Sequence, residues 1–364
     1  MLETMTSRER QLAALRCQPV DRLPFWPKIG GAYALAQGEP FRTMSVSELH
    51  EWIGSDEQAY GPPCVKEVRT KTSLERVKED AVQTVVYRTP AGTLTSVDRY
   101  DPISDSRHPI EFPVKSVQDI EAMSLFFADA RPEFDPVQFE RAKAFIEDLG
   151  EDGLASASIG ISPLMWWIQL LAGIENGLLM VADHQQEVEA LFERMHNMLC
   201  RTAEIIADKS PYEVIYSVEN TSTTLISPQL FKRYCCGHLM DYGRIVNSAG
   251  KLHVLHMCGK IKSLLPDVAG LPAAGIEALT SSPVGNATLL DGRSACPDKS
   301  LCGGTNATLW MATPETILTT IESDLDVLPH QRGIFLSSAG VMPPACRPET
   351  IREVAEWVKH YPVR

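Results

Sequence analysis

The chain has 364 residues, of which 44% are hydrophobic and 22% charged, a balance typical of a globular protein and not of a fibre. Acidic residues outnumber basic ones, 47 to 34, and the formal charge of −13 disfavours nucleic acid and membrane surfaces as partners. No apolar run approaches the ~20 residues of a membrane span, and residues 1–10 lack the apolar stretch of a signal peptide. The nine cysteines are irregularly spaced, so we expect a cytoplasmic protein with reduced thiols.

The N-terminal third predicts a helix, a short strand and an elaborated region. Thr6 and Glu9 form a capping-box pattern that predicts a helix ending before Pro19. Residues 23–31 predict a short strand that enters a glycine turn. Residues 50–125 are rich in charge, proline and turns, and 84–97 predict a β-hairpin. We interpret 50–125 as an insertion within one domain that spans residues 1–364; the alternative is a small separate domain.

From residue 130 onward, predicted helices and strands alternate. The expected strands are 154–161, 213–218, 251–258, 275–280, 299–302 and 333–337, and the expected helices are 136–149, a segment near 166, 184–208, 228–249, 260–268, 313–323 and 348–360. Six strand–helix units can be counted outside 50–125, and that region has room for two more. Alternation of this kind implies parallel strands, and eight units would close an α/β fold of the (β/α)8 TIM-barrel type. The alternative, an open doubly wound sheet, lacks a Gly-x-Gly-x-x-Gly turn.

The strongest candidate for metal chemistry lies at the end of the strand at 251–258. His256 and Cys258 are two positions apart, so on a strand they face the same side, and Gly259 begins the following loop. Imidazole nitrogen and thiolate sulfur are ligands that zinc prefers, and a catalytic zinc needs three protein ligands. We considered Cys346, Cys302 and Glu277 for the third ligand. Cys346 is favoured, because it lies in the loop after the last strand.

Polar residues follow two other predicted strands. Glu219 and Asn220 come directly after the strand at 213–218, where a carboxylate and an amide could orient a substrate or accept a proton; the alternative is a turn or helix cap. Asn306 follows Gly303 and Gly304, whose lack of side chains allows a close backbone approach, and its amide could face the pocket. The chain has no phosphate-binding loop, serine-hydrolase elbow or His-Glu-x-x-His pair.

Several motifs, in order, resemble the uroporphyrinogen decarboxylase superfamily over nearly the whole chain. The matching stretches lie at 8–24, 89–93, 112–119, 227–231, 250–260, 303–306 and 343–351. The resemblance implies a single (β/α)8 barrel. The decarboxylases of this superfamily bind the carboxylates of their substrate with arginines after the first strand, whereas here Lys28 is the one cation of that loop. A single ammonium is a poor substitute for several forked guanidinium donors.

The resemblance favours the second branch, methyltransferases that work with a corrinoid protein. Their His-x-Cys…Cys zinc site is similar to His256, Cys258 and a later cysteine. The last cysteine of the pattern would fall near Gly340, and Cys346 comes about six residues late. Either the loop delivers Cys346, or the third ligand differs, or the metal is lost.

We therefore expect a zinc-dependent enzyme that moves a methyl group between a small methyl ether, amine or thiol and a corrinoid (cobalamin) cofactor. The chain lacks the Asp-x-His-x-x-Gly motif of corrinoid carriers, so the cofactor would arrive on a separate protein. Lys28 and Asn306 are the expected substrate contacts, and Glu219 and Asn220 the expected catalytic pair. The alternatives are a decarboxylase or a non-catalytic ligand-binding barrel. A monomer or homodimer is expected.

Overall fold

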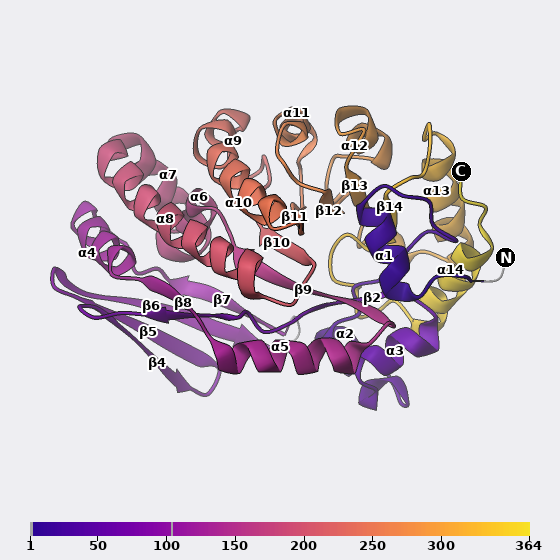
Figure 1. Ribbon diagram of the computed structural model, residues 1–364, viewed down its shortest axis with the longest axis horizontal. Coiled ribbons are helices and arrows are strands. Elements are labelled where there is room, and N and C mark those ends of the chain that lie inside the picture. Colours follow the sequence, from indigo (N-terminus) through magenta and orange to yellow (C-terminus); the bar gives the residue numbers. More distant parts are fainter. Residues whose placement is uncertain (1–2, 103–104) are drawn as a thin grey trace.

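Eight parallel strands form one sheet that curves into a barrel, in the order β1-β14-β13-β12-β11-β10-β9-β2 (Figure 1). This computed structural model describes residues 3–102 and 105–364. The barrel strands are β1 (Phe25–Trp26), β2 (Glu57–Tyr60), β9 (Gly153–Gly160), β10 (Val214–Val218), β11 (Leu252–His256), β12 (Gly275–Leu279), β13 (Ser300–Gly304) and β14 (Ile334–Ser337). The predicted barrel is confirmed. The expected strand count is corrected, because the 50–125 region supplies one barrel strand, β2, and not two.

Asp56 links the two ends of the sheet, where β1 and β2 meet. Its backbone N–H donates to Phe25 O at 2.7 Å, and its Oδ2 accepts from the Phe25 N–H at 2.8 Å. The carboxylate is buried, and it also accepts from Arg10 Nη1 at 2.7 Å and Arg22 Nη1 at 2.7 Å. Two guanidinium groups therefore compensate the charge of one buried carboxylate. The same carboxylate helps to join β1 to β2, which are not paired as neighbours in the sheet.

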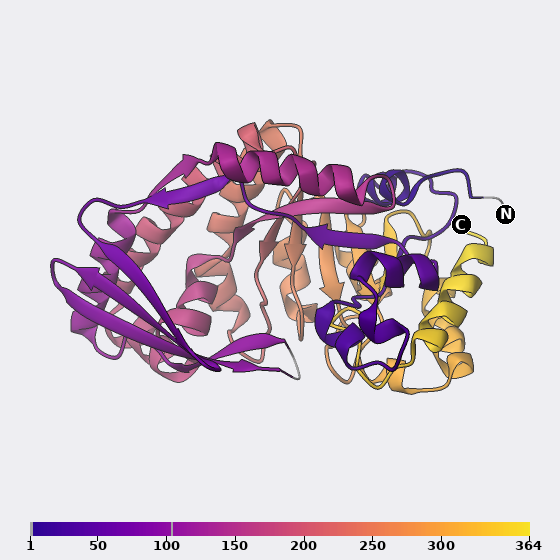
Figure 2. The same cartoon turned by 90° about the horizontal axis from the view of Figure 1, so that it is seen from below.

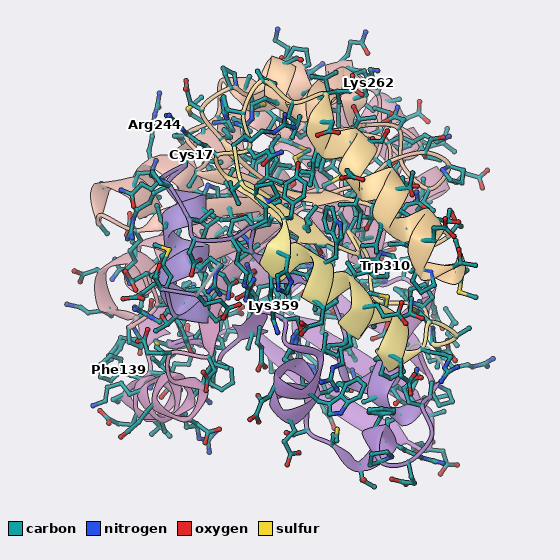
Figure 3. The ribbon with its side chains drawn as sticks, turned by 90° about the vertical axis from the view of Figure 1, so that its right-hand side faces the viewer. Cys17, Phe139, Arg244, Lys262, Trp310 and Lys359 are labelled. Carbon is teal, nitrogen blue, oxygen red and sulfur yellow. The ribbon has the colours of Figure 1, made fainter. Side chains whose placement is uncertain are left out.

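The helices pack around the outside of the sheet (Figure 1). They are α1 (Ser7–Leu15), α2 (Gly31–Leu35), α3 (Val46–Ile53), α4 (Val117–Ala128), α5 (Pro136–Leu149), α6 (Pro163–Trp166), α7 (Ile174–Asp183), α8 (Gln185–Lys209), α9 (Pro228–Tyr234), α10 (Cys236–Ser248), α11 (Leu265–Ala269), α12 (Leu289–Ala295), α13 (Pro314–Asp326) and α14 (Pro348–His360). Figure 3 views the side that carries α13 and α14, with Lys359 on α14.

Most of these helices match the predicted ones, and the capping box of Thr6 and Glu9 begins α1. The helix expected at 228–249 is divided at Cys235, and α2, α3, α4, α7 and α12 were not predicted. In α12, Gly292 weakens the helical signal of the sequence. A Cβ at this glycine would lie 2.9 Å from Leu279 Cδ2, so the helix packs closely on β12.

Two hydrophobic cores give the barrel one closed end and one open end. The larger core lies between the strands and the outer helices. The smaller core fills the barrel interior with residues such as Trp26, Tyr216 and Phe335, and it includes Leu12 and Leu15 of α1. Leu15 lies beside Gly275, the first residue of β12. Because α1 thus covers the ends at which the strands begin, the working end of the barrel is the one at which they finish.

The elaborated region forms a separate antiparallel sheet of four strands at the end of the molecule away from both termini (Figure 2). The strands are β4 (Ser73–Glu79), β5 (Val82–Thr89), β6 (Gly92–Asp101) and β7 (Ser106–Glu111), and β5 and β6 are the predicted hairpin. A shorter ladder joins β3 (Val65–Val68) to β8 (Arg131–Phe134). Within the described ranges, no helix is both long and apolar enough to span a membrane.

The closure at Asp56 predicts a large loss of stability when its carboxylate is removed. Asp56→Ala should lower the free energy of unfolding by about 3–5 kcal/mol, because two buried guanidinium groups lose their shared partner. Denaturant unfolding measures the change. Asp326→Ala, which removes an exposed ion pair with Arg364, is the matched control and should change stability by less than about 1 kcal/mol. Equal losses in the two variants would contradict this role of Asp56.

Candidate active site at the open end of the barrel

His256 lies at the end of β11 and Cys258 two residues later in the following loop, so the strand expected at 251–258 ends before Cys258. His256 is the last residue of the strand and pairs in register with Val218 on one side and Glu277 on the other. Cys258 follows in the loop, and its Sγ donates to Asn220 Oδ1 at 3.6 Å. Gly259 has φ +92°, and a Cβ there would lie 2.9 Å from Ser222 Oγ, so the loop needs glycine at this position.

A buried carboxylate, Glu277 of β12, joins two cationic side chains at this end. One carboxylate oxygen contacts His256 Nδ1, and the other contacts Lys28 Nζ. The side chain of Glu277 is 1% exposed, whereas those of Lys28 and His256 are 14% and 16% exposed. Glu277 therefore lies behind the other two groups, which reach toward solvent.

The loop after β14 holds Lys28 in place. Its backbone N–H donates to Ser338 Oγ at 3.2 Å, and its carbonyl accepts from the Met342 N–H at 2.9 Å. Its ammonium donates to Ala339 O at 3.2 Å and lies 5.0 Å from the centre of the Trp26 ring. These contacts orient the ammonium toward Glu277.

The charges of this group shift the pKa values of its members in opposite directions. Burial lowers the pKa of His256, but the negative charge of Glu277 outweighs burial and raises it to about 9. Burial raises the pKa of Glu277, but Lys28 and His256 outweigh it and lower the pKa to about 2. At neutral pH the group therefore contains an imidazolium, a carboxylate and an ammonium.

Glu219 and Asn220, the predicted catalytic pair, have different surroundings. The Glu219 carboxylate is fully buried and accepts from the Ser162 N–H at 2.7 Å and from Ser162 Oγ at 2.6 Å. Burial raises its pKa to about 7, against the opposing effect of Ser162. Asn220 has φ +49° and lies beside Cys258 and Gln169. Asn220 thus borders the site, whereas Glu219 ties the loop after β10 to the loop after β9.

Asn306 and Cys346 lie away from the site, whereas Cys302 is a buried neighbour of Glu277. The Asn306 amide is used within the chain: Nδ2 donates to Ser281 Oγ at 2.9 Å, and Oδ1 accepts from the Thr308 N–H at 3.0 Å. Cys302 is a buried β13 residue opposite Glu277, and burial raises its pKa. Cys346 is also buried, and its Sγ lies 3.9 Å from Arg347 O.

The chemistry of these side chains suits zinc at two positions but does not complete a site. His256 and Cys258 supply nitrogen and sulfur, and a carboxylate bonded to the other imidazole nitrogen is the usual way to orient such a ligand. Over residues 3–102 and 105–364, however, no three His, Cys, Asp or Glu side chains are arranged to hold a metal ion. Cys346 has no contact with His256 or Cys258, and both oxygens of Glu277 are engaged. The residues present therefore do not fit a zinc ion with three protein ligands.

Sequence reasoning named Lys28, His256 and Glu277 for separate reasons and missed their direct contact. It also missed Ser162, which holds Glu219, and Tyr60, an exposed side chain whose ring lies 5.2 Å from that of the buried Tyr216. One signal was available for Glu277. It is two positions after Gly275, and residues that alternate on a barrel strand share the interior face.

Comparisons with known proteins are consistent with this architecture. The family model for uroporphyrinogen decarboxylase (URO-D) matches residues 109–361, more than half of the chain. A solved structure of a methyltransferase from Methanosarcina mazei has 16% sequence identity and a TM-score of 0.59, with 98% of each chain covered. This likeness shows a shared fold.

A second structure, the "Putative Vitamin-B12 Independent Methionine Synthase from Listeria monocytogenes", has 11% identity and a TM-score of 0.43 over 95% of this chain and 96% of that one. This score is too low to support an argument. A search of curated protein sequences finds no match.

The ion pair at His256 predicts a specific titration. In the folded protein, NMR should show His256 titrating near pH 9, and Glu277→Gln should lower its pKa to about 6.5 or below, because burial then acts without the compensating charge. The raised pKa of His256 adds stability that is complete below about pH 6.5 and is lost as the pH rises through 9. An unchanged titration in Glu277→Gln would contradict this arrangement; Glu349→Gln is the control.

The raised pKa of Glu219 predicts that stability falls as the pH rises, whereas an ion-paired carboxylate makes stability rise with pH. Its folded-state pKa of about 7 exceeds the usual 4.5, so its contribution to stability is complete below pH 4.5 and is lost as the pH rises through 7. Relative to Glu219→Gln, the free energy of unfolding of the wild type should fall by about 3 kcal/mol across this interval. Denaturant unfolding at several pH values measures the difference. Glu204→Gln, at an exposed position, is the control, and its free energy of unfolding should change with pH in parallel with that of the wild type.

Proposed function

This chain belongs to the uroporphyrinogen decarboxylase family, and we propose that it is a methyltransferase that transfers a methyl group from a small methyl ether or amine to the corrinoid of a separate protein. The fold it shares with a methyltransferase structure supports this proposal. A decarboxylase is the alternative. Lys28 and His256 are 14% and 16% exposed, so a cofactor that another protein carries could approach them, and a bound corrinoid would supply the cobalt that accepts the methyl group.

The observation that carries the proposal is the pair of cationic groups at the open end. His256 and Lys28 both reach toward solvent from one buried carboxylate. When a methyl group leaves an ether oxygen or an amine nitrogen, the bond electrons stay on the heteroatom, which then needs a proton or a positive charge beside it. An imidazolium and an ammonium supply both.

Each side chain of the site then has a defined task. His256 donates a proton to the leaving heteroatom from the ring nitrogen that Glu277 does not engage, and its pKa of about 9 keeps that proton bound at neutral pH. Glu277 positions the ring and Lys28. Lys28 stabilises negative charge on the substrate, and Asn220 and Cys258 border the same space.

This direction of transfer follows from the protonation state of His256. An imidazolium can donate a proton to a leaving oxygen or nitrogen, but it cannot accept one from a thiol. The site is therefore better suited to a methyl donor than to a thiol acceptor. No step uses the predicted zinc, because its ligand set is incomplete in this fold.

The proposal predicts methyl transfer to free cob(I)alamin. With a panel of methyl ethers and methylamines, the purified protein should form methylcobalamin, which absorbance follows. His256→Gln should lower the rate by about 10²–10⁴-fold, the usual worth of a general acid. The same substitution at exposed His360 on α14 is the matched control and should leave the rate unchanged.

Two results would contradict the proposal. One is a rate that His256→Gln does not change. The other is release of carbon dioxide from small carboxylic acids without any corrinoid, which would identify a decarboxylase.

A further inference from the structure

We propose that the ammonium of Lys28 is the cation bound at this end of the barrel. It contacts the carboxylate of Glu277, which a divalent metal at His256 and Cys258 would need as its third ligand. One oxygen of Glu277 contacts Lys28 Nζ, and the other contacts His256 Nδ1. The carboxylate is 1% exposed, so water does not compete for either oxygen. The inference concerns which cation the site holds and does not depend on the reaction proposed above.

Lys28 is held in this position by more than its charge. Both its backbone N–H and its carbonyl bond to the loop after β14, through Ser338 and Met342, and its ammonium bonds to Ala339 O in the same loop. The ammonium is therefore a fixed positive charge and not a freely moving side chain. A fixed ammonium repels a dication at the same carboxylate, because like charges in a partly buried site are weakly screened.

The remaining side chains do not offer a substitute third ligand. Cys302 is a buried thiol whose pKa burial raises, and Cys346 lies against Arg347 O. Without the ammonium, in contrast, one oxygen of Glu277 would lose its cationic partner and could bind a metal in its place. Nitrogen, sulfur and carboxylate oxygen together form a three-ligand set of the kind that binds catalytic zinc with one open position.

Zinc content measures this competition directly. Untagged wild type, Lys28→Met and Lys28→Arg are exposed to zinc, desalted and assayed by elemental analysis, with circular dichroism to confirm folding. Lys28→Met should gain about one equivalent of zinc over the wild type. Lys28→Arg keeps the charge and should remain at the wild-type level. Lys28→Met combined with Cys258→Ser should lose the gained zinc.

A second group of side chains needs its own control. His196 and Cys200 on α8 lie beside Asp241 on α10, with His196 Nε2 3.2 Å from Asp241 Oδ2 and 3.5 Å from Cys200 Sγ. Zinc held adventitiously there would be lost in His196→Ala. Each variant is therefore also prepared with His196→Ala, so that the zinc counted belongs to the barrel.

Two outcomes would overturn the inference. The first is wild-type protein that holds about one equivalent of zinc and loses it in His256→Ala, because the metal and Lys28 would then coexist. The second is a folded Lys28→Met protein that gains no zinc. Methyl transfer could fail in every variant without affecting either result, so failure of the proposed function remains distinguishable.

Discussion

The contact of Glu277 with both His256 and Lys28 is the interaction on which the site depends. A carboxylate with 1% exposure is costly to bury unless cations compensate it, and here two cations from distant parts of the sequence do so. The same contact fixes the protonation of His256, orients its ring and draws the loop after β1 toward β12. Loss of the carboxylate would therefore change the charge, geometry and acidity of the site together.

The rest of the barrel makes this arrangement possible by leaving one end open. Asp56 joins β1 to β2 with two guanidinium groups, and α1 covers the end at which the strands begin. The end at which the strands finish is braced from loop to loop. Glu219 connects two of these loops through Ser162, and Asn306 connects two others through Ser281. These hydrogen bonds join the loops at this end of the barrel.

Family membership and local chemistry thus lead to different expectations about the cation. The resemblance to the methyltransferase branch implies zinc, and His256 with Cys258 would supply two suitable ligands. The third position is where this chain departs: Cys346 lies away from the pair, and Lys28 engages the carboxylate that could replace it. An ammonium and an imidazolium can polarise a leaving heteroatom without a metal. The loss of one zinc ligand therefore does not imply the loss of methyl transfer.

The sequence by itself determined the barrel and the hairpin, because hydrophobic periodicity and turn residues are local properties of the chain. It did not determine the role of Glu219, the position of Cys346 or the contact among Lys28, Glu277 and His256. Lys28 in the loop after β1 and Glu277 on β12 are far apart in the chain, and only barrel closure brings them together. Whether two distant side chains meet depends on register, loop path and burial, which the tertiary structure alone decides.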